Sequence, residues 1–274
     1  MLSKSNPESI QALNDNRNII RSNTGGWRVG EGVYSHGYSM LDELVGKKSY
    51  FQLMILNATG RLVERRLADW SEAMYGCLSW PDPRIWCNQI GAFAGEAKAT
   101  VVAGTTVGVM AADSKMYGTY PIIEGMNFIQ SSLKNVNSGQ TTKAIIDDNI
   151  KKNRGKLNIT GYVRPLAKGD ERIRAMQRVS KLLGFEDGPH VRLAYQIENE
   201  ITNRFDEGMN INGYVAAFFC DQGFSADEVY QTFSTVVMSG VTACYLDTLK
   251  KPNDSFLPLR CDDIKYLGRE KREI

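Results

Sequence analysis

The sequence predicts an all-α protein, and three observations support this fold class. Apolar residues recur at helical spacing through most of the chain after Met40. Helix-start signals precede several of these stretches, among them the capping box Ser-Ala-Asp-Glu at residues 225–228. Strand signals are scarce, and the glycine-rich stretch 24–37 is expected to form loops or short strands. We therefore expect roughly ten helices or more, without internal repeats.

The expected helices can be placed in order along the chain. After a polar entry segment over residues 1–24, they are predicted over residues 40–59, 61–78, 84–112, 122–133, 141–150, 170–183, 189–205 and 226–246. Gly60 is expected to end the first, and Asp82 and Pro83 to begin the third as cap and first-turn proline. Asp170 is expected to cap the helix that Gly184 ends.

The stretch after Arg84 is unusually rich in small side chains. Two rows at i, i+4 spacing can be drawn in it: Gly91, Gly95, Ala99 and Ala103, and then Gly104, Gly108 and Ala112. A glycine inside a helix costs roughly 1 kcal/mol relative to alanine. Repeating that cost is reasonable where another backbone must come close. We therefore expect these helices to be buried in the domain core or in a dimer interface.

Composition and charge argue against several classes of function. With 33 basic and 31 acidic residues the net charge is +2, which gives no indication of a nucleic-acid or membrane-surface partner. Five cysteines without Cys-x-x-Cys spacing argue against a zinc site, and no metal site is expected. The uncharged run 229–246 is too polar to span a membrane. No signal peptide is recognisable, so we expect a reducing, cytoplasmic setting.

Several blocks, in order along the chain, carry a resemblance to one superfamily. They are residues 36–46 (HGYSMLDELVG), the Gly/Ala-rich helices after Arg84, residues 161–164 (GYVR), 170–172 (DER), 210–214 (NINGY), 240–247 (GVTACYLD) and 260–268. Together they resemble the citrate synthase superfamily, and especially the citryl-CoA lyase module of ATP-citrate lyase. No block is specific alone, but the ordered set is, and it spans roughly residues 34 to 274.

The resemblance implies a particular organisation. A large helical domain would span residues 1–118 and 214–274, and a smaller one residues 119–213, with the ligand cleft between them. The family acts on coenzyme A thioesters without a tightly bound cofactor. Its members are dimers in which a C-terminal arginine reaches the partner's site. Arg269 and Arg272 are the candidates for that arginine here. We expect a homodimer, or a heterodimer with a second citrate synthase-like chain.

The family's acid–base residues are substituted in this chain. Asn212 stands where the resemblance implies the catalytic aspartate, and asparagine cannot accept a proton. Arg164 stands at the loop histidine; arginine stays protonated, although it can polarise a carbonyl or bind a carboxylate. Cys244 replaces a later histidine and is expected to be a core side chain, and residues 118–124 lack the earlier histidine. Losing one positioned acid–base group typically lowers the rate by about 10²–10⁴-fold.

Other candidate site residues remain. Arg172, Arg260, Arg269, Arg272 and His36 are candidates to bind substrate carboxylates, and Gly161 and Lys168 to bind coenzyme A. Tyr162, Asp221 or Glu171 would have to serve as a recruited base. His36 could equally be structural, and His190 is expected to be so. Arg174, Arg178 and Lys181 form a basic helix face that is either solvated or available to phosphates.

Three hypotheses follow from this pattern. The first is a diverged enzyme that makes or breaks a carbon–carbon bond in a CoA thioester or polycarboxylate by Claisen-type chemistry. Arg164 would act as electrophile, Asn212 as hydrogen-bonding group and Tyr162 as a catalytic hydroxyl. The second is a non-catalytic pseudoenzyme or structural subunit of a hetero-oligomer. The third is a sensor that closes on a polycarboxylate.

Overall fold

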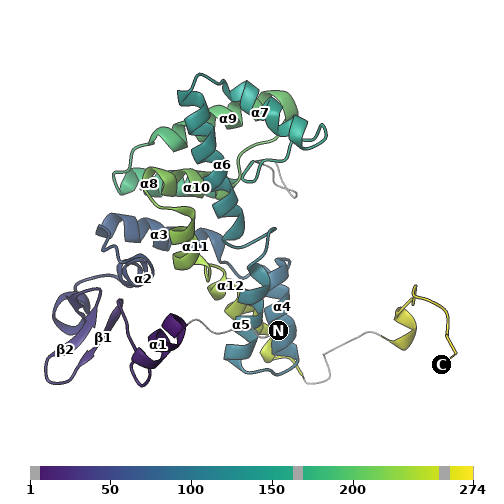
Figure 1. Ribbon diagram of the computed structural model, residues 1–274. Helices are drawn as coiled ribbons and strands as arrows, with labels where there is room; N and C mark the ends of the chain where they lie inside the picture. The colour runs from purple at the N-terminus through teal and green to yellow at the C-terminus, as the bar shows by residue number, and fades with distance from the viewer. Residues whose placement is uncertain (1–6, 163–168, 253–259, 274) are drawn as a thin grey trace. The chain divides into compact units, whose positions relative to one another are not determined.

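The computed structural model describes residues 7–162, 169–252 and 260–273, except the side chains of Pro7 and Cys261. The chain divides into two compact units, residues 1–69 and 70–274. Both are drawn in Figure 1, and each is described by itself. Helix predominates in the described residues, which confirms the expected all-α class. No helix among them is long and apolar enough to cross a membrane.

The first unit contains the strands. Helix α1 (Pro7–Asp15) is followed by an antiparallel sheet in the order β1-β2-β3, formed by β1 (Gly25–Arg28), β2 (Gly32–Ser35) and β3 (Tyr38–Ser39). A π-helical turn (Met40–Leu44) and α2 (Tyr50–Thr59) complete this unit, and α3 (Arg65–Leu78) crosses into the second. The glycine-rich stretch therefore forms short strands, one of the two alternatives that its sequence allowed.

Helix α2 shows how local signals define its ends. Ser49 and Gln52 form a capping box at its start, and Gly60 ends it in the left-handed region with φ of 74°. The next helix begins at Arg65 and not at residue 61 as predicted. The Gln52 side chain donates a hydrogen bond to the Val63 carbonyl, which holds the intervening residues outside the helix.

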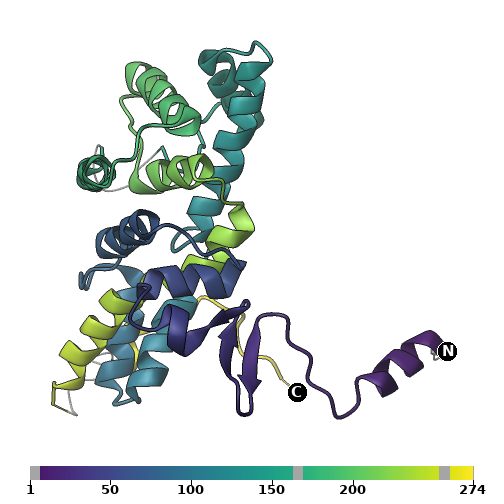
Figure 2. The same cartoon turned by 90° about the vertical axis from the view of Figure 1, so that its left-hand side faces the viewer.

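The second unit is helical. Its elements are α4 (Trp86–Glu96), α5 (Val101–Ala112), α6 (Tyr120–Asn137), α7 (Thr142–Lys152), α8 (Glu171–Leu182), α9 (Pro189–Phe205), α10 (Ile211–Asp221), α11 (Ala226–Phe233), α12 (Met238–Leu249) and a 3₁₀ turn (Cys261–Asp263). Helices α4, α5 and α12 pack together, and α6, α7, α9 and α10 form a second group (Figures 1 and 2). Helix α8 packs on α10, and α11 on α6.

Helix α10 lies at the centre of the second group and is buried along nearly its whole length. Trp70 stacks on Phe218 of α10 with 3.6 Å between ring centres. The Trp70 indole also donates to the Ser180 hydroxyl at 2.8 Å, and that hydroxyl lies 3.0 Å from the Tyr214 hydroxyl. The buried polar groups are thus paired with one another, which fixes α3, α8 and α10 in one packing arrangement.

The small residues allow close helix packing, as predicted. A Cβ at Gly104 would lie 2.3 Å from the Tyr245 ring, and one at Gly108 2.4 Å from Val241. A Cβ at Gly95 would lie 2.3 Å from the Tyr245 carbonyl oxygen. These contacts confirm burial in the core formed with α12. The first predicted row, from Gly91 to Ala103, is wrong as one continuous row, because a turn between α4 and α5 interrupts it at Ala99.

Two further boundaries differ from prediction. Helix α4 begins at Trp86 because the Asp82 carboxylate binds the backbone and side chain of Arg84 instead of capping a helix; Ile85 is the cap residue. The predicted helix 226–246 is two helices, α11 and α12, separated by residues 234–237. The caps at Asp170 and Ser225 are confirmed, as are the ends of α8 and α9. Thr141, which was expected to be helical, is instead the cap of α7.

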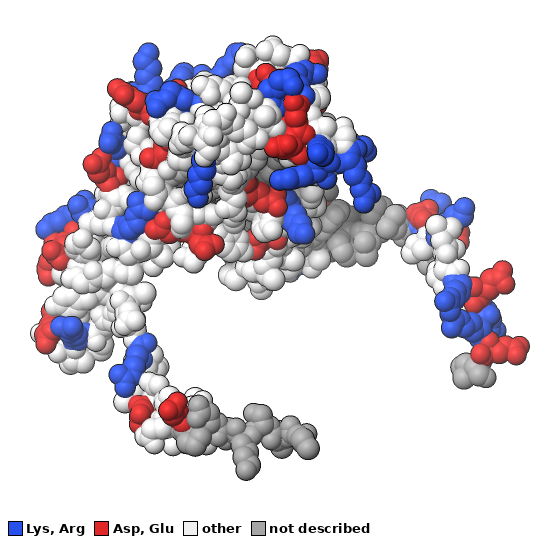
Figure 3. Space-filling model, turned by 45° about the horizontal axis from the view of Figure 1, so that its top comes forward, with Lys and Arg blue, Asp and Glu red and all other residues white. Residues whose placement is uncertain are grey.

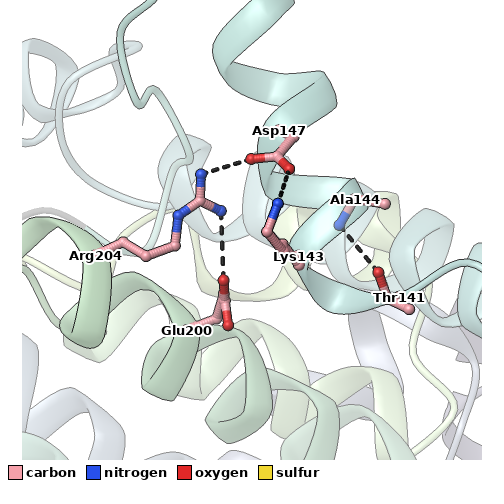
Figure 4. Close-up of polar contacts among 6 residues, drawn as sticks. All are labelled: Thr141, Lys143, Ala144, Asp147, Glu200 and Arg204. Carbon is pink, nitrogen blue, oxygen red and sulfur yellow. Dashed lines mark hydrogen bonds and ion pairs between the residues drawn. The ribbon is translucent and has the colours of Figure 1, made fainter.

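An ion-pair network joins α7 to α9 (Figure 4). Arg204 of α9 contacts Asp147 of α7 at 2.5 Å and Glu200 of its own helix at 3.4 Å. Asp147 also accepts from Lys143 at 2.8 Å, one turn earlier on α7. Thr141 caps α7 through the Ala144 amide. Helix α7 is thereby held against α9 up to the turn that leads to Gly161.

Candidate functional site

Gly161 and Gly213 bring the two segments singled out by the sequence into direct contact. The Asn210 amide donates to the Gly161 carbonyl at 2.8 Å. A Cβ on Gly161 would lie 2.8 Å from the Gly213 Cα, and one on Gly213 only 2.5 Å from the Gly161 oxygen. Gly161 also has a φ of 99°, which favours glycine. Any side chain at either position would therefore separate the loop from the start of α10.

Asn212 lies in the first turn of α10, beside this contact. Asn210 caps the helix by accepting from the Asn212 amide at 2.9 Å. The Asn212 side chain is half-buried and forms no hydrogen bond with any described residue. The backbone donors of this helix start are already used by Asp170 and Asn210. The Asn212 side-chain amide is therefore the group of this turn that remains available to a ligand.

Asp170 connects this turn to α8. Its carboxylate accepts from the Arg172 guanidinium at 2.7 and 2.6 Å, from the Arg172 amide at 3.1 Å and from the Ile211 amide at 2.9 Å. Burial alone would raise the pKa of this carboxyl. The hydrogen bonds and charge of Arg172 outweigh burial, so the pKa of Asp170 lies below its usual value. Asp170 is thus an ionised anchor and not a proton acceptor.

Arg172 is held on two sides. Asp170 engages its Nε and Nη2 atoms, and the guanidinium lies over the Trp80 ring, 5.3 Å from the ring centre. The side chain is 19% exposed, and Nη1 has no partner among the described residues. A cation with one open edge can bind a carboxylate without repositioning.

A second cationic feature precedes Gly161 directly. The last turn of α7 and the residues after it carry four exposed cations, Lys151, Lys152, Arg154 and Lys156, none of which is ion-paired with a described residue. We call this segment the basic turn. Its ends are joined because Asn149 and Asn158 exchange side-chain-to-backbone hydrogen bonds at 2.9 and 3.0 Å. In Figure 3, Lys and Arg side chains gather at one edge of the helical body, whereas charges of both signs alternate elsewhere on that face.

The fold has been seen in other proteins. No family model and no curated protein matches the sequence. Solved structures do match. Citryl-CoA lyase from Hydrogenobacter thermophilus aligns with a TM-score of 0.76 and 23% identity, covering 93% of this chain and 97% of that one. ATP citrate lyase from Methanothrix soehngenii, in complex with citrate and coenzyme A, aligns with a TM-score of 0.76 and 16% identity over 98% of this chain and 45% of that one.

Citrate synthase from Thermoplasma acidophilum aligns with a TM-score of 0.63 and 16% identity over 82% of this chain and 58% of that one. The chain has the citrate synthase-like fold. This confirms the expected fold class and places the Gly161–Gly213 contact and the Asp170–Arg172 pair in a citrate synthase-like framework.

Several predicted residues of this citrate synthase-like chain have other roles or lie elsewhere. Tyr162 is buried; its hydroxyl donates to the Ala194 carbonyl at 3.2 Å, and burial raises its pKa far above the usual value. It cannot accept a proton near neutral pH. Cys244 is buried in α12, and burial raises the pKa of its thiol, as expected of a core side chain. Arg164 and Lys168 lie outside the described residues.

Asp221 and Glu171 are the other candidate bases, and the Asp221 carboxylate is engaged at the far end of α10. Asp221 accepts from the amides of His190 and Val191 and from the His190 ring, at 2.8 to 3.0 Å, and so fixes the start of α9. Helix α10 separates it from Asn212 by about 14 Å at the rise of an α-helix. Glu171 is exposed in the first turn of α8.

The remaining predicted ligand-binding residues are not brought to Arg172 by any described contact. Arg260, Arg269 and Arg272 are exposed. The Arg260 amide donates to the Asp263 carboxylate at 2.8 Å, and its carbonyl accepts from the Asp263 amide at 3.0 Å. His36 lies in the first unit, in the turn between β2 and β3. It has a positive φ of 46°, and its Nε2 atom is buried without a partner there. No group of three or more metal-ligating side chains occurs in the described parts of the chain.

Two elements of the site were missed in the sequence. The basic turn could have been found, because Lys-Lys-Asn-Arg-Gly-Lys at residues 151–156 is a local run of cations just before the glycine loop. Trp80 had no sequence signal as a site residue, since its contact with Arg172 depends on tertiary packing. Tyr117 belongs to the same neighbourhood: burial raises its pKa to about 12, opposed by the charge of Arg172, so its hydroxyl remains protonated.

Proposed function

We propose that this protein binds a coenzyme A thioester together with a polycarboxylate and acts on a carbon–carbon bond by Claisen or retro-Claisen chemistry. One observation carries the proposal: the Asp170 carboxylate binds the Arg172 guanidinium and also accepts from the Ile211 amide, and so joins the first turn of α8 to the first turn of α10, which carries Asn212. Two groups suited to a carbonyl and a carboxylate thus lie in the first turns of two helices that one carboxylate connects. The match to structures of citryl-CoA lyase and of ATP citrate lyase with citrate and coenzyme A supports the same substrate class.

Each group has a defined chemical task in this proposal. The open edge of Arg172 binds a substrate carboxylate as an ion pair with hydrogen bonds. The Asn212 amide donates to the thioester carbonyl oxygen, where negative charge develops as the enolate forms. The basic turn supplies cations for the phosphates of coenzyme A. Gly161 lets the loop approach α10 closely enough for the three to act on one ligand.

The missing proton acceptor limits the rate of such a reaction. Asp170 is ionised but engaged in hydrogen bonds, and Asn212 has no basic atom in its side chain. We therefore propose slow turnover, about 10²–10⁴-fold below that of a site with a carboxylate base. The Asn212→Asp variant places a carboxylate where the amide now stands, with nearly unchanged shape.

Two measurements test the proposal. The first is cleavage of citryl-CoA, monitored through the acetyl-CoA that it releases. The second is calorimetric titration with citrate and with coenzyme A. We expect the wild type to bind both ligands. Asn212→Asp, alone and with Arg164→His, should raise turnover by about 10²-fold or more. Failure of the wild type to bind either ligand contradicts the proposed substrate class. Binding without a gain in the Asn212→Asp variant contradicts the assigned role of Asn212.

The second candidate function is that of a non-catalytic subunit. The presence of Asn212, where the resemblance implies a catalytic aspartate, favours it. In that role the protein would bind its ligands but gain turnover only when assembled with a catalytically complete chain. Purification alone and together with such a chain separates the two functions. Turnover by the isolated protein would exclude the structural role.

We also propose that α4 and α5 form the contact surface of a homodimer, or of a heterodimer with a second citrate synthase-like chain. Helix α5 contains no charged residue, although much of it is exposed. Val102 and Met110 on α5 are 72% and 70% exposed, and Phe93 on α4 is 58% exposed. An uncharged, apolar helix surface of this kind marks a site of protein association.

A further inference from the structure

Trp80 lies against Arg172, the candidate ligand-binding cation that Asp170 also holds. The Arg172 guanidinium carbon is 5.3 Å from the centre of the Trp80 ring. This separation is within the range of a favourable cation–π interaction. The guanidinium carbon lies over the Trp80 ring, while Asp170 binds along the Nε–Nη2 edge of the guanidinium. The two neighbours therefore restrain the group in different directions.

These restraints are complementary in geometry. The two hydrogen bonds to Asp170 set the rotation of the guanidinium within its own plane, because both carboxylate oxygens take part. They resist tilting of that plane much less. The cation–π contact with the Trp80 ring restrains the guanidinium carbon independently of these hydrogen bonds. With both in place, the remaining edge at Nη1 has a fixed direction.

The Trp80 backbone is itself firmly held. The Asn88 side chain of α4 donates to the carbonyls of Trp80 and Asp82 at 3.0 and 2.9 Å. The Gly240 amide at the start of α12 donates to the Ser79 hydroxyl at 2.9 Å. A Cβ on Gly240 would lie 2.6 Å from the Trp80 carbonyl oxygen, so α12 packs directly against this segment. The ring beneath Arg172 thus belongs to a rigid support built by α4 and α12.

We propose that Trp80 is a positioning residue that fixes Arg172 with its Nη1 edge presented to an anionic ligand group. The inference rests on the proposed function for the identity of that group, a carboxylate. Trp80 does not touch the ligand in this role. It acts through Arg172, and it links the helices α4 and α12 to the cation at the start of α8.

The first measurement reports on Arg172 without any ligand. A ring current from Trp80 should displace the Arg172 Nε–H resonance in a ¹⁵N-correlated spectrum, and Arg172→Lys identifies that signal by its loss. We expect Trp80→Leu to move the signal toward the position of exposed arginines, and Trp80→Phe to retain much of the displacement. Trp27→Leu, a matched change at an exposed tryptophan of the first unit, should leave it in place. An Arg172 signal unaffected by Trp80→Leu overturns the inference.

The second measurement is citrate affinity by calorimetry, with coenzyme A as the comparison ligand. Trp80→Leu should weaken citrate binding by about 3- to 30-fold, the range of a partly buried cation–π contact, while coenzyme A binding changes little. Trp80→Phe should weaken citrate binding much less than Trp80→Leu does. Thermal unfolding of each variant verifies that it is folded.

The outcomes separate the two proposals. A wild type that binds no citrate contradicts the proposed function, and the Arg172 resonance then decides alone whether Trp80 positions the cation. If Trp80→Leu binds citrate as tightly as the wild type does and its Arg172 resonance is not displaced, the proposed function stands and the role of Trp80 is overturned. Equal weakening of citrate binding and coenzyme A binding in Trp80→Leu would also contradict the positioning role, because a general structural effect would explain that result.

Discussion

Asp170 accepts a hydrogen bond from the Ile211 amide at 2.9 Å, so one carboxylate serves two helices. It caps α8 through Arg172 and holds the first turn of α10, which carries Asn212. The residues proposed to bind carboxylate and carbonyl are consequently fixed relative to each other by a single buried charge. The following predictions test this arrangement and its surroundings.

Removing the Asp170 carboxylate should strongly destabilise the protein. Asp170→Ala leaves Arg172 without its counter-ion and the Ile211 amide without an acceptor, and we expect a loss of about 3–5 kcal/mol in the free energy of unfolding. Urea unfolding measures it. Asp82→Ala is the matched control, because Asp82 binds Arg84 with the same pattern at the surface, where Arg84 is 89% exposed. A loss as large at Asp82 would show that burial of the Asp170 pair is unimportant.

The Asp170 contribution should depend on pH with a defined sign. The folded pKa of this carboxyl lies below the value of about 3.9 for an unfolded aspartate. Its stabilisation is therefore complete above that value and is lost as the pH falls through the folded pKa. The difference in unfolding free energy between wild type and Asp170→Asn should be constant from about pH 6 to 7 and shrink toward acidic pH. A difference that grows on acidification contradicts the assignment.

Gly161→Ala should separate the loop from α10. The added methyl would lie 2.8 Å from the Gly213 Cα, at a φ that alanine avoids. We expect about 1–3 kcal/mol from the backbone conformation and a further 1–3 kcal/mol, roughly, from the clash, with loss of ligand binding. Gly139→Ala measures the cost of the backbone conformation alone, because Gly139 has a similar φ of 95° and a Cβ added there would have no atom within 4 Å. Equal effects at the two glycines would argue against a tight contact.

Neutralising the basic turn should weaken coenzyme A binding. We expect the combined Lys151→Ala, Lys152→Ala, Arg154→Ala and Lys156→Ala variant to lose at least about tenfold in affinity at low salt, and less at high salt because exposed charges are screened. Replacing Arg174, Arg178 and Lys181 on the exposed face of α8 tests the competing phosphate site. The larger loss in calorimetric titrations identifies which surface binds the phosphates.

Charge placed on α5 should prevent self-association. Val102→Glu with Met110→Glu puts two carboxylates on the proposed contact surface, where burying them unpaired is costly. Sedimentation velocity should then show a monomer in place of a dimer. Leu182→Glu, an equally exposed apolar position on α8, should leave the dimer intact. A wild type that is monomeric at all concentrations would remove the basis for this surface.

The sequence was informative where structure depends on neighbouring residues. Caps at Asp170 and Ser225 use side chains within three residues of the helix start, and their positions were predicted correctly. The start of α4 and the break before α12 were not. Asp82 has the composition of a cap but binds Arg84, and the uncharged run conceals the interruption at residues 234–237.

The candidate site could be predicted in part for the same reason. Gly161 and the residues 210–214 were singled out from a resemblance, and the structure brings them together. Tyr162 was a candidate base on sequence alone, and tertiary packing buries its hydroxyl against the Ala194 carbonyl. The Trp80–Arg172 contact joins residues 92 positions apart in number, so no local pattern could reveal it. Burial and long-range contacts, which decide chemical availability, are properties of the folded chain.

Helix α10 is tethered by a carboxylate at each end. Asp170 binds its first turn, and Asp221 in its last turn binds the start of α9. These contacts at both ends of α10 oppose movement of the helix along its axis. The residue at position 212 can therefore be exchanged without shifting the backbone that presents it. In such a framework the side chain at position 212, and with it the reaction, can change or be lost while the surrounding ligand-binding residues keep their positions.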